Sequence, residues 1–280
     1  MEFDEGYLYD RDTILNNLKR LNFRDREYLR RTIGGLAQDA APITEPVTYT
    51  VGVGQDFELF HDAMLWATRQ TTLDKGVITL SLSDGIHYVG GPDMFNQHSW
   101  AYYKIDHQII VRGSAKENCT ITMPPDDDGD MYPTVFMTSG GYFILRDITV
   151  DTALGGYPYA GNVSVAYSSN CYTKVERCVF KNTDMGFYTG YGGTGVVKDS
   201  ILDNCAMGVE TAGTNTSIHV RDTTIQNCAV GVNNSGAGSM IKLQNVTFIN
   251  NTSDTSMPVN EIQYNGGYIT NSTGALSFKA

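Results

Sequence analysis

Residues 175–183 read VERCVFKNT, and the same pattern returns three times further along the chain. It recurs as VKDSILDNC at 197–205, VRDTTIQNC at 220–228 and LQNVTFINN at 243–251, at spacings of 22, 23 and 23 residues. An earlier copy, LRDITVDTA at 145–153, lies 30 residues upstream, and a Gly/Tyr loop around GGYPYAG accounts for the extra length. A repeat of this length without helical periodicity predicts the coils of a parallel β-helix.

A second, shorter motif follows each of the first three full copies at the same distance. It is a glycine between two apolar residues, in Met185-Gly186-Phe187, Met207-Gly208-Val209 and Val230-Gly231-Val232. Two motifs that share one period indicate a genuine structural repeat.

Aligning the copies sorts their residues into columns, as a stack of coils requires. Two apolar columns are predicted to point inward: Val150, Phe180, Leu202, Ile225 and Phe248, and Leu145, Val175, Val197, Val220 and Leu243. One polar column is predicted to face water: Arg146, Glu176, Lys198, Arg221 and Gln244. A fourth column is a ladder of asparagines whose amides are predicted to hydrogen-bond from coil to coil at a turn: Asn182, Asn204, Asn227 and Asn250.

The predicted fold class is all-β, a single-stranded parallel β-helix of about eight coils, preceded by a capping helix and a short helical N-terminal segment. At one interstrand spacing per coil, eight coils give a rod on the order of 40 Å long. The β-helix domain is predicted over 47–280, with a capping strand, helix and strand over 47–91 and coils over 105–276. The helix begins near Asp56, and residues 83–85 form a turn between alternating strands.

Residues 1–46 differ from the rest of the chain. Two short amphipathic helices are predicted in TILNNLKRL and REYLRRTI, followed by the extended linker AAPITEP. Because two such helices have little core of their own, the segment is an anchor or adaptor that packs on another chain, or a cap that folds back on its own domain.

Composition excludes several classes of protein. The formal net charge is −11, which argues against a general nucleic-acid or anionic-membrane binder. No window of 18 apolar residues is present, so no membrane span is expected, and the acidic start MEFDEGYLYD indicates no secretory signal. The 5 cysteines lack metal-ligand spacing and are predicted to be buried free thiols of a protein folded in a reducing cytoplasm.

The segments YTVGVGQDFELFHDAMLWA (49–67), ITLSLSDGIHYV (78–89), IIVRGSAKENCTITM (109–123) and YFILRDITVDTA (142–153) extend the pattern toward the N-terminus. Together with the repeats, they resemble the pectate-lyase-like right-handed β-helix family, and the opening resembles the β-helix domain of bacteriophage tailspikes and tail fibres. The resemblance covers about residues 47–275. It implies a right-handed coil, a helix that caps the first coil, and a homotrimer.

The resemblance implies two functions of different classes. The first is a bacteriophage tail fibre, tailspike or baseplate-associated virion protein, folded in the host cytoplasm. It attaches through residues 1–46 to another tail or baseplate protein and contacts host surface polysaccharide. The alternative is a polysaccharide depolymerase, a hydrolase or lyase acting in a groove on the coils. The sequence leaves enzymatic activity undecided and favours a non-catalytic protein, because no cluster resembling the family's lyase motifs is found.

Three carboxylates are the candidate catalytic residues of the depolymerase: Asp203, Glu210 and Asp184. Glycoside hydrolysis needs two carboxyl groups roughly 5–9.5 Å apart, a separation that residues on adjacent coils readily reach. Asp203 and Glu210 lie on one predicted coil and Asp184 at the turn of the coil before. The competing interpretation is that charged columns simply solvate the outside of the coil.

Aromatic residues in Gly-rich, loop-like stretches are the candidate binding residues: Trp100, Tyr102, Tyr157, Tyr159, Tyr188 and Tyr191. Such rings stack on sugar faces, and in a trimer they can equally be buried at subunit contacts.

One acidic loop is a weak calcium candidate. PPDDDGDMYP (124–133) places Asp126, Asp128 and Asp130 close together, although the EF-hand pattern with its distant Glu is absent. A solvated acidic turn is the alternative. No cofactor and no other metal site is expected.

Overall fold

The computed structural model describes residues 42–73, 75–89, 105, 107–122, 141–152, 162–164, 171–190, 192–255, 262–264, 267–271 and 277–279, with the last three ranges and 162–164 described by their backbone. The chain divides into two units, Met1–Ala41 and Pro42–Ala280, and all described residues belong to the second. The helices predicted in TILNNLKRL and REYLRRTI therefore lie outside the described residues.

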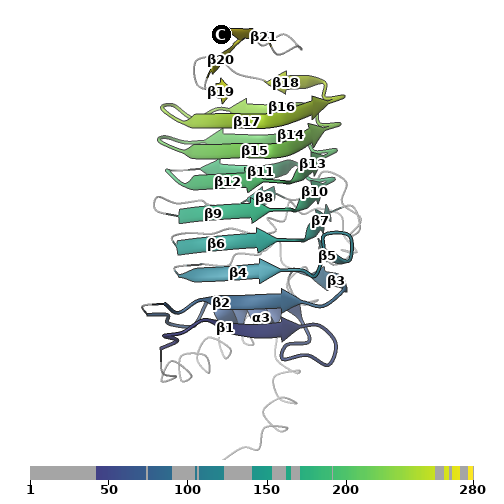
Figure 1. Ribbon diagram of the computed structural model, residues 1–280, viewed down its shortest axis with the longest axis vertical. Coiled ribbons are helices and arrows are strands. Elements are labelled where there is room, and N and C mark those ends of the chain that lie inside the picture. Colours follow the sequence, from purple (N-terminus) through teal and green to yellow (C-terminus); the bar gives the residue numbers. More distant parts are fainter. Residues whose placement is uncertain are drawn as a thin grey trace, which may run out of the picture. The chain divides into compact units, whose positions relative to one another are not determined.

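The second unit is a stack of parallel strands (Figure 1). Among the described residues, nine strands follow one another in chain order to form a first stack: β1 (Val47–Val51), β2 (Ile78–Leu82), β4 (Gln108–Arg112), β6 (Gly141–Arg146), β9 (Cys171–Glu176), β12 (Thr194–Lys198), β15 (Ser217–Gln226), β17 (Met240–Ile249) and β19 (Ile262–Tyr264). Nine stacked strands give eight coil-to-coil steps, and the all-β parallel β-helix is confirmed.

Each coil continues into a second and a third stack. The second stack holds β3 (Gly85–Tyr88), β5 (Cys119–Thr122), β7 (Thr149–Asp151), β10 (Val179–Lys181), β13 (Ile201–Asp203) and the second halves of β15 and β17. The third stack holds β8 (Asn162–Ser164), β11 (Met185–Gly190), β14 (Met207–Ala212), β16 (Val230–Asn234) and β18 (Ser253–Thr255). Beyond β19, the strands β20 (Gly267–Asn271) and β21 (Ser277–Lys279) pair antiparallel.

The register of the first two stacks confirms the aligned columns of the repeat. Phe180 pairs with Val150 on one side and Leu202 on the other, and the column continues through Ile225 to Phe248. The column through Leu145 and the polar column through Arg146 are likewise in register up to β17. Because strand side chains alternate between the two faces, this register brings the apolar columns into one continuous core.

Two corners of each coil are turned by residues with positive φ. The corner between the first and second stacks uses Asp147, Arg177, Asp199, Asp222 and Asn245, and the corner between the second and third stacks uses Asn182, Asn204, Asn227 and Asn250. Asn and Asp tolerate this left-handed conformation better than other residues with a side chain, which explains why the repeat keeps them there. At the second corner, Asn204 Nδ2 donates to Asn182 Oδ1 at 2.7 Å and Asn227 Nδ2 donates to Asp203 Oδ1 at 2.7 Å.

The first coil begins earlier than the sequence pattern indicates. β1 already pairs in parallel with β2, and β2 with β4, so the coils start at residue 47 rather than at 105. The turn at 83–85 is a corner of the coil, because β3 pairs with β5 rather than with β2. Ile43, inside the predicted linker, bonds to the chain that precedes β2, through Thr71 O and the Leu73 amide.

The capping helix is α3 (Phe60–Ala67), which buries Phe60, Met64 and Ala67. It begins four residues after Asp56, because the Asp56 carboxylate accepts hydrogen bonds from the Thr50 amide at 2.7 Å and its hydroxyl at 2.9 Å. These bonds tie the loop to β1 instead of starting a helix. Trp66 packs against Tyr49, with ring centroids 4.6 Å apart, and so joins the helix to the first strand.

The cysteines occupy the interior, as predicted. All 5 are buried and free: Cys119, Cys171, Cys178, Cys205 and Cys228. Cys178 belongs to a small polar ladder just after the first corner, in which its amide donates to Ser200 Oγ at 3.1 Å and the Ser200 amide donates to Thr223 Oγ1 at 3.4 Å. Burial raises the pKa of the Cys178 thiol to about 12, so the thiol stays protonated at neutral pH.

Candidate functional site

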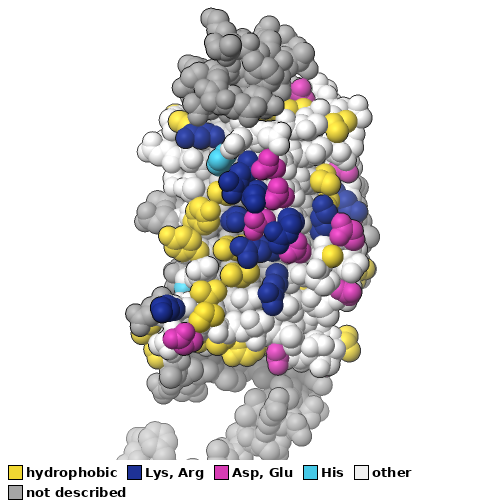
Figure 2. Space-filling view, viewed as in Figure 1, with side chains coloured by type: hydrophobic (Ala, Val, Ile, Leu, Met, Phe, Trp, Pro, Cys, Tyr) yellow, Lys and Arg dark blue, Asp and Glu magenta, His cyan; other side chains and the backbone are white. Residues whose placement is uncertain are grey.

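The outward surface of the first stack from β4 to β17, here called the basic face, carries most of the positive charge of that surface. Its strands present six cationic side chains at outward positions: Arg112, Arg146, Lys174, Lys198, Arg221 and Lys242. Figure 2 shows Lys and Arg gathered along the middle of this surface, with Asp and Glu interleaved and a strip of hydrophobic side chains beside them. The alternation of each strand places these residues opposite the core columns.

Glu176 is the single carboxylate at these outward strand positions. It lies 3.0 Å from Arg146 Nε, 3.1 Å from Lys174 Nζ and 3.4 Å from Lys198 Nζ, which connects β6, β9 and β12. Burial alone would raise the pKa of Glu176, but the hydrogen bond and charge of Lys174, together with Arg146 and Lys198, outweigh burial and hold the pKa below its ordinary value. Glu176 is therefore ionised at neutral pH and fixes three cations in place.

Three other cations of the basic face are not neutralised. Within the described part of the chain, Arg112, Arg221 and Lys242 form no ion pair. His219 lies next to Arg221 on β15 and is in register with Lys242. Its pKa is lowered, first by burial and then by the charge of Arg221, so the imidazole stays neutral and the positive charge remains with the arginine and lysine.

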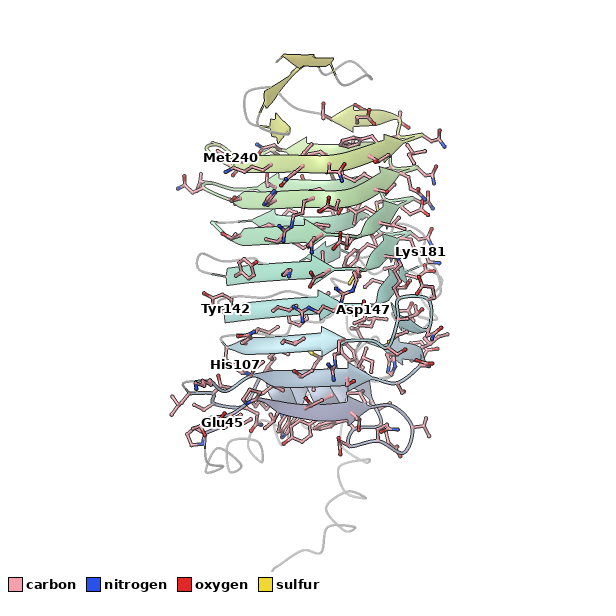
Figure 3. All side chains as sticks on the ribbon, in the orientation of Figure 1. Glu45, His107, Tyr142, Asp147, Lys181 and Met240 are labelled. Atoms are coloured by element: carbon pink, nitrogen blue, oxygen red, sulfur yellow. The ribbon has the colours of Figure 1, made fainter. Side chains whose placement is uncertain are left out.

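An aromatic pair borders the cations where the strands begin. Tyr142 and Tyr172 are register partners, with ring centroids 5.6 Å apart and planes inclined at 43°. The side chain of Tyr142 is 56% exposed, and Met240, at the same end of β17, is 44% exposed. Figure 3 labels Tyr142 and Met240 at this end of the face and Asp147 at the opposite end, beside the first corner. Exposed, paired rings next to cations form a surface suited to sugars, which stack on aromatic faces.

A second arrangement, on the third stack, contains two of the predicted catalytic carboxylates. Glu210 lies on β14 with its side chain opposite the core-facing Val209, yet the residue is 8% exposed. Its Oε1 accepts from Asn233 Nδ2 at 2.8 Å. Burial raises the pKa of Glu210, and the charge of Asp184 raises it further; burial also raises the pKa of Asp184. The structure thus brings Glu210 and Asp184 within electrostatic reach of each other.

Asp203, the third predicted catalytic residue, is directed elsewhere. It lies on β13 in the second stack, in register with Lys181, and its Oδ1 accepts the hydrogen bond from Asn227. The Asn204 corner separates it from β14 along the chain. Asp203 therefore contributes to the ladder at the second corner and does not join Glu210 and Asp184.

The predicted aromatic and calcium candidates are mostly beyond description. Tyr188 lies on β11 next to Glu210 in register and is 9% exposed. The remaining candidates lie outside the described residues: Trp100, Tyr102, Tyr157, Tyr159, Tyr191, Asp126, Asp128 and Asp130. In the described ranges, no group of three or more His, Cys, Asp or Glu side chains is placed to hold a metal ion. The helix described in the chain is also too short and polar to cross a bilayer.

Sequence reasoning missed Tyr142 and Tyr172 as a pair. The polar column already contained Arg146, Lys198 and Arg221, so the cations were visible but were interpreted as a solvated surface. The tyrosines are 30 residues apart, across the irregular Gly/Tyr loop, and alignment of LRDITVDTA with VERCVFKNT places them three residues before each copy. Extending the aligned columns three residues upstream would have found them.

Comparison with known proteins agrees with this fold. The family model for the right-handed β-helix region matches residues 101–253. No curated protein matches the chain. Among solved structures, the chain is similar to a pectin methylesterase mutant in complex with a hexasaccharide, with 11% identity and a TM-score of 0.39 over 76% of this chain and 68% of that one.

Proposed function

The chain belongs to the right-handed β-helix family, and from that premise we propose that it is the rod of a bacteriophage tail fibre, tailspike or baseplate-associated protein. In this role the rod is a homotrimer that contacts host surface polysaccharide and attaches through residues 1–46 to another protein of the tail or baseplate. The resemblance of residues 49–67 and 78–89 to tailspike β-helix domains supports the viral assignment. The buried free thiols support folding in the reducing cytoplasm of the host before assembly into the virion.

The exposed Tyr142–Tyr172 pair is the observation that supports contact with polysaccharide. A stack of parallel strands repeats its outward side chains from coil to coil, so it offers a polymer a row of similar contacts rather than one pocket. Two rings on adjacent coils match two consecutive sugars of such a polymer, and the cations beside them supply hydrogen-bond donors.

Glycan-array binding with wild type and the Tyr142→Ala variant tests this contact. We expect the variant to lose binding by roughly tenfold, the loss that about 1.4 kcal/mol of stacking would give. Tyr88 is 44% exposed on β3, in the second stack, and Tyr88→Ala is the matched control. Equal binding by both variants would remove the basic face as the glycan site.

The mass of the purified protein in solution, from light scattering behind a sizing column, tests the assembly. A trimer, about three times 30.8 kDa, supports the virion rod. A clean monomer contradicts it and shifts the assignment to a free-standing β-helix enzyme.

One observation favours an enzyme as the second candidate function. Glu210 and Asp184 interact electrostatically, and both have a raised pKa, which is the condition for a protonated general acid beside a second carboxyl group. If the protein is a polysaccharide depolymerase, Glu210→Gln abolishes release of reducing ends from the polymer, while Glu58→Gln, at an exposed glutamate before α3, leaves it intact. Turnover that survives Glu210→Gln would rule out this pair.

A further inference from the structure

The charge of the basic face is opposite in sign to that of the whole chain. Counting the first corner from Asp147 to Asp222 together with the outward strand positions, seven cationic side chains face four carboxylates, an excess of three positive charges. The complete chain carries −11. Such an excess on one surface of an acidic protein attracts a negatively charged partner specifically to that surface.

We propose that the basic face binds a carboxylate-bearing polysaccharide, such as a polymer of uronic acids, laid along the stack of coils. The inference rests on the proposed function, for which it names the class of polysaccharide. The carboxylates of the polymer pair with Arg112, Arg221 and Lys242, the three cations that form no ion pair among the described residues, and its sugar rings stack on Tyr142 and Tyr172.

The geometry of the stack supports a polymer rather than a single anion. Outward positions in register recur once per coil, so the column from Arg112 through Arg146, Lys198 and Arg221 repeats at about 4.8 Å per step. A polyuronate carries one carboxylate on every sugar and presents its charges with a similarly regular repeat. Glu176 takes one place in the same column, and it competes with the polymer for Arg146, Lys174 and Lys198.

Two other occupants of the face are less consistent with it. The core of a subunit interface is depleted of Lys and Glu, whereas the centre of this face is a Lys–Glu–Arg cluster around Glu176. A nucleic acid would be repelled by the −11 charge over its much longer extent, because its binding depends on a broad excess of positive charge.

The experiment titrates the full-length protein with a polyglucuronate of defined length and with its methyl ester, in which the same sugars carry no charge. Binding is measured calorimetrically at low salt. We expect the polyglucuronate to bind at least tenfold more tightly than the ester, with an affinity that falls as salt is raised. The double variant Arg112→Glu/Arg221→Glu should lose at least tenfold in affinity. The double variant Arg69→Glu/Lys75→Glu changes the same charge in the segment between α3 and β2 and should bind as wild type.

Glu176→Gln gives a readout that a merely structural face would not show. Removing the competing carboxylate frees Lys174, Lys198 and Arg146, so the affinity for polyglucuronate should increase several-fold. Unfolding curves of each variant establish that it is folded. An unchanged or reduced affinity of a folded Glu176→Gln protein overturns the proposal.

The remaining outcomes separate this inference from the proposed function. Equal binding of polyglucuronate and its ester, with loss in Tyr142→Ala, refutes the charge specificity and leaves the contact with polysaccharide standing. Binding of duplex DNA that is stronger than that of polyglucuronate, and that is lost in Arg112→Glu/Arg221→Glu, overturns the proposal in favour of a nucleic-acid surface. No binding of any polymer contradicts both.

Discussion

Asn204 illustrates how a single side chain holds a corner of the coil. Its φ of 52° lies in the left-handed region, and its amide donates to Asn182 on the neighbouring coil. Asparagine serves both needs, because its short polar side chain tolerates this conformation and reaches the next amide. The ladder therefore records a backbone requirement and a contact between coils at the same position.

The two contributions of Asn204 can be separated by substitution. Asn204→Gly keeps the left-handed backbone and loses the hydrogen bond, which costs about 1 kcal/mol. Asn204→Ala loses the hydrogen bond and adds roughly 1–2 kcal/mol of backbone strain. Denaturant midpoints should therefore fall in the order wild type, Gly, Ala. A Gly variant less stable than the Ala variant would show that the corner does not require positive φ.

Glu210 carries a pH-dependent cost to stability. Its folded pKa is raised, so the folded state binds the proton more tightly than the unfolded state. Stability is accordingly lost as the pH rises from the ordinary carboxyl value, about 4.3, through the raised value. Glu210→Gln removes the charge and keeps an acceptor for Asn233, so its Tm should exceed that of wild type by roughly 2 °C at pH 7 and match it at pH 3.5. A lower Tm at pH 7 would mean that the ionised carboxylate stabilises the fold.

The inward residues were predictable from the sequence, and the functional surface was not. Phe180 and its column are apolar in every copy because each position meets the same neighbours one coil above and below. Outward positions meet only solvent or a ligand, so their residues vary from coil to coil: Tyr172, Thr194 and Ser217 occupy one such column. Alternation therefore identifies the core, while the pairing of Tyr142 with Tyr172 needs the register.

At the scale of elements, the glycine of the short motif sets how closely the coils approach. A Cβ on Gly208 would lie 2.6 Å from the backbone oxygen of Gly231, and one on Gly186 would lie 2.6 Å from that of Gly208. The obstacle is the backbone of the next coil, which cannot rotate away. The Met-Gly-Val pattern is thus explained by close packing at the start of β11, β14 and β16.

Gly208→Ala should consequently force the third stack apart. We expect a loss of about 1–3 kcal/mol, the usual cost of overpacking, measured from the denaturant midpoint. Gly54, at a φ of 72° in the loop before α3, has open space around it, so Gly54→Asn is a control for glycine replacement without a clash. A Gly208→Ala protein as stable as wild type would show that β14 and β16 can separate at little cost.

The ends of the β-helix were harder to predict than its middle. The regular period of 22–23 residues starts only at β9, whereas the strands of the first coils pair at intervals of 31, 31, 34 and 30 residues. Insertions at the corners, including the segment with α3, enlarge those intervals without disturbing the strands. A search for a fixed period therefore finds the later coils and misses β1, β2 and β4.

At the scale of the whole unit, each coil contacts only the coil before it and the coil after it. Such a stack behaves as a linear array, in which damage spreads to neighbours before it affects distant coils. Phe180→Ala empties a fully buried site and should cost about 3–5 kcal/mol. Amide exchange should then accelerate in β7, β10 and β13 and remain slow in β2 and β4. Uniform acceleration across all coils would show that the unit unfolds as one.

The direction of the strand pairing also determines how the rod responds to force. Hydrogen bonds between parallel strands run from coil to coil, so tension along the stack is borne by one interface after another in series, and the weakest of them gives way first. Compression along the same direction instead presses together the close-packed layers around Phe143, Phe180 and Leu202, which resist a change in volume. A column of this kind transmits a push more faithfully than a pull.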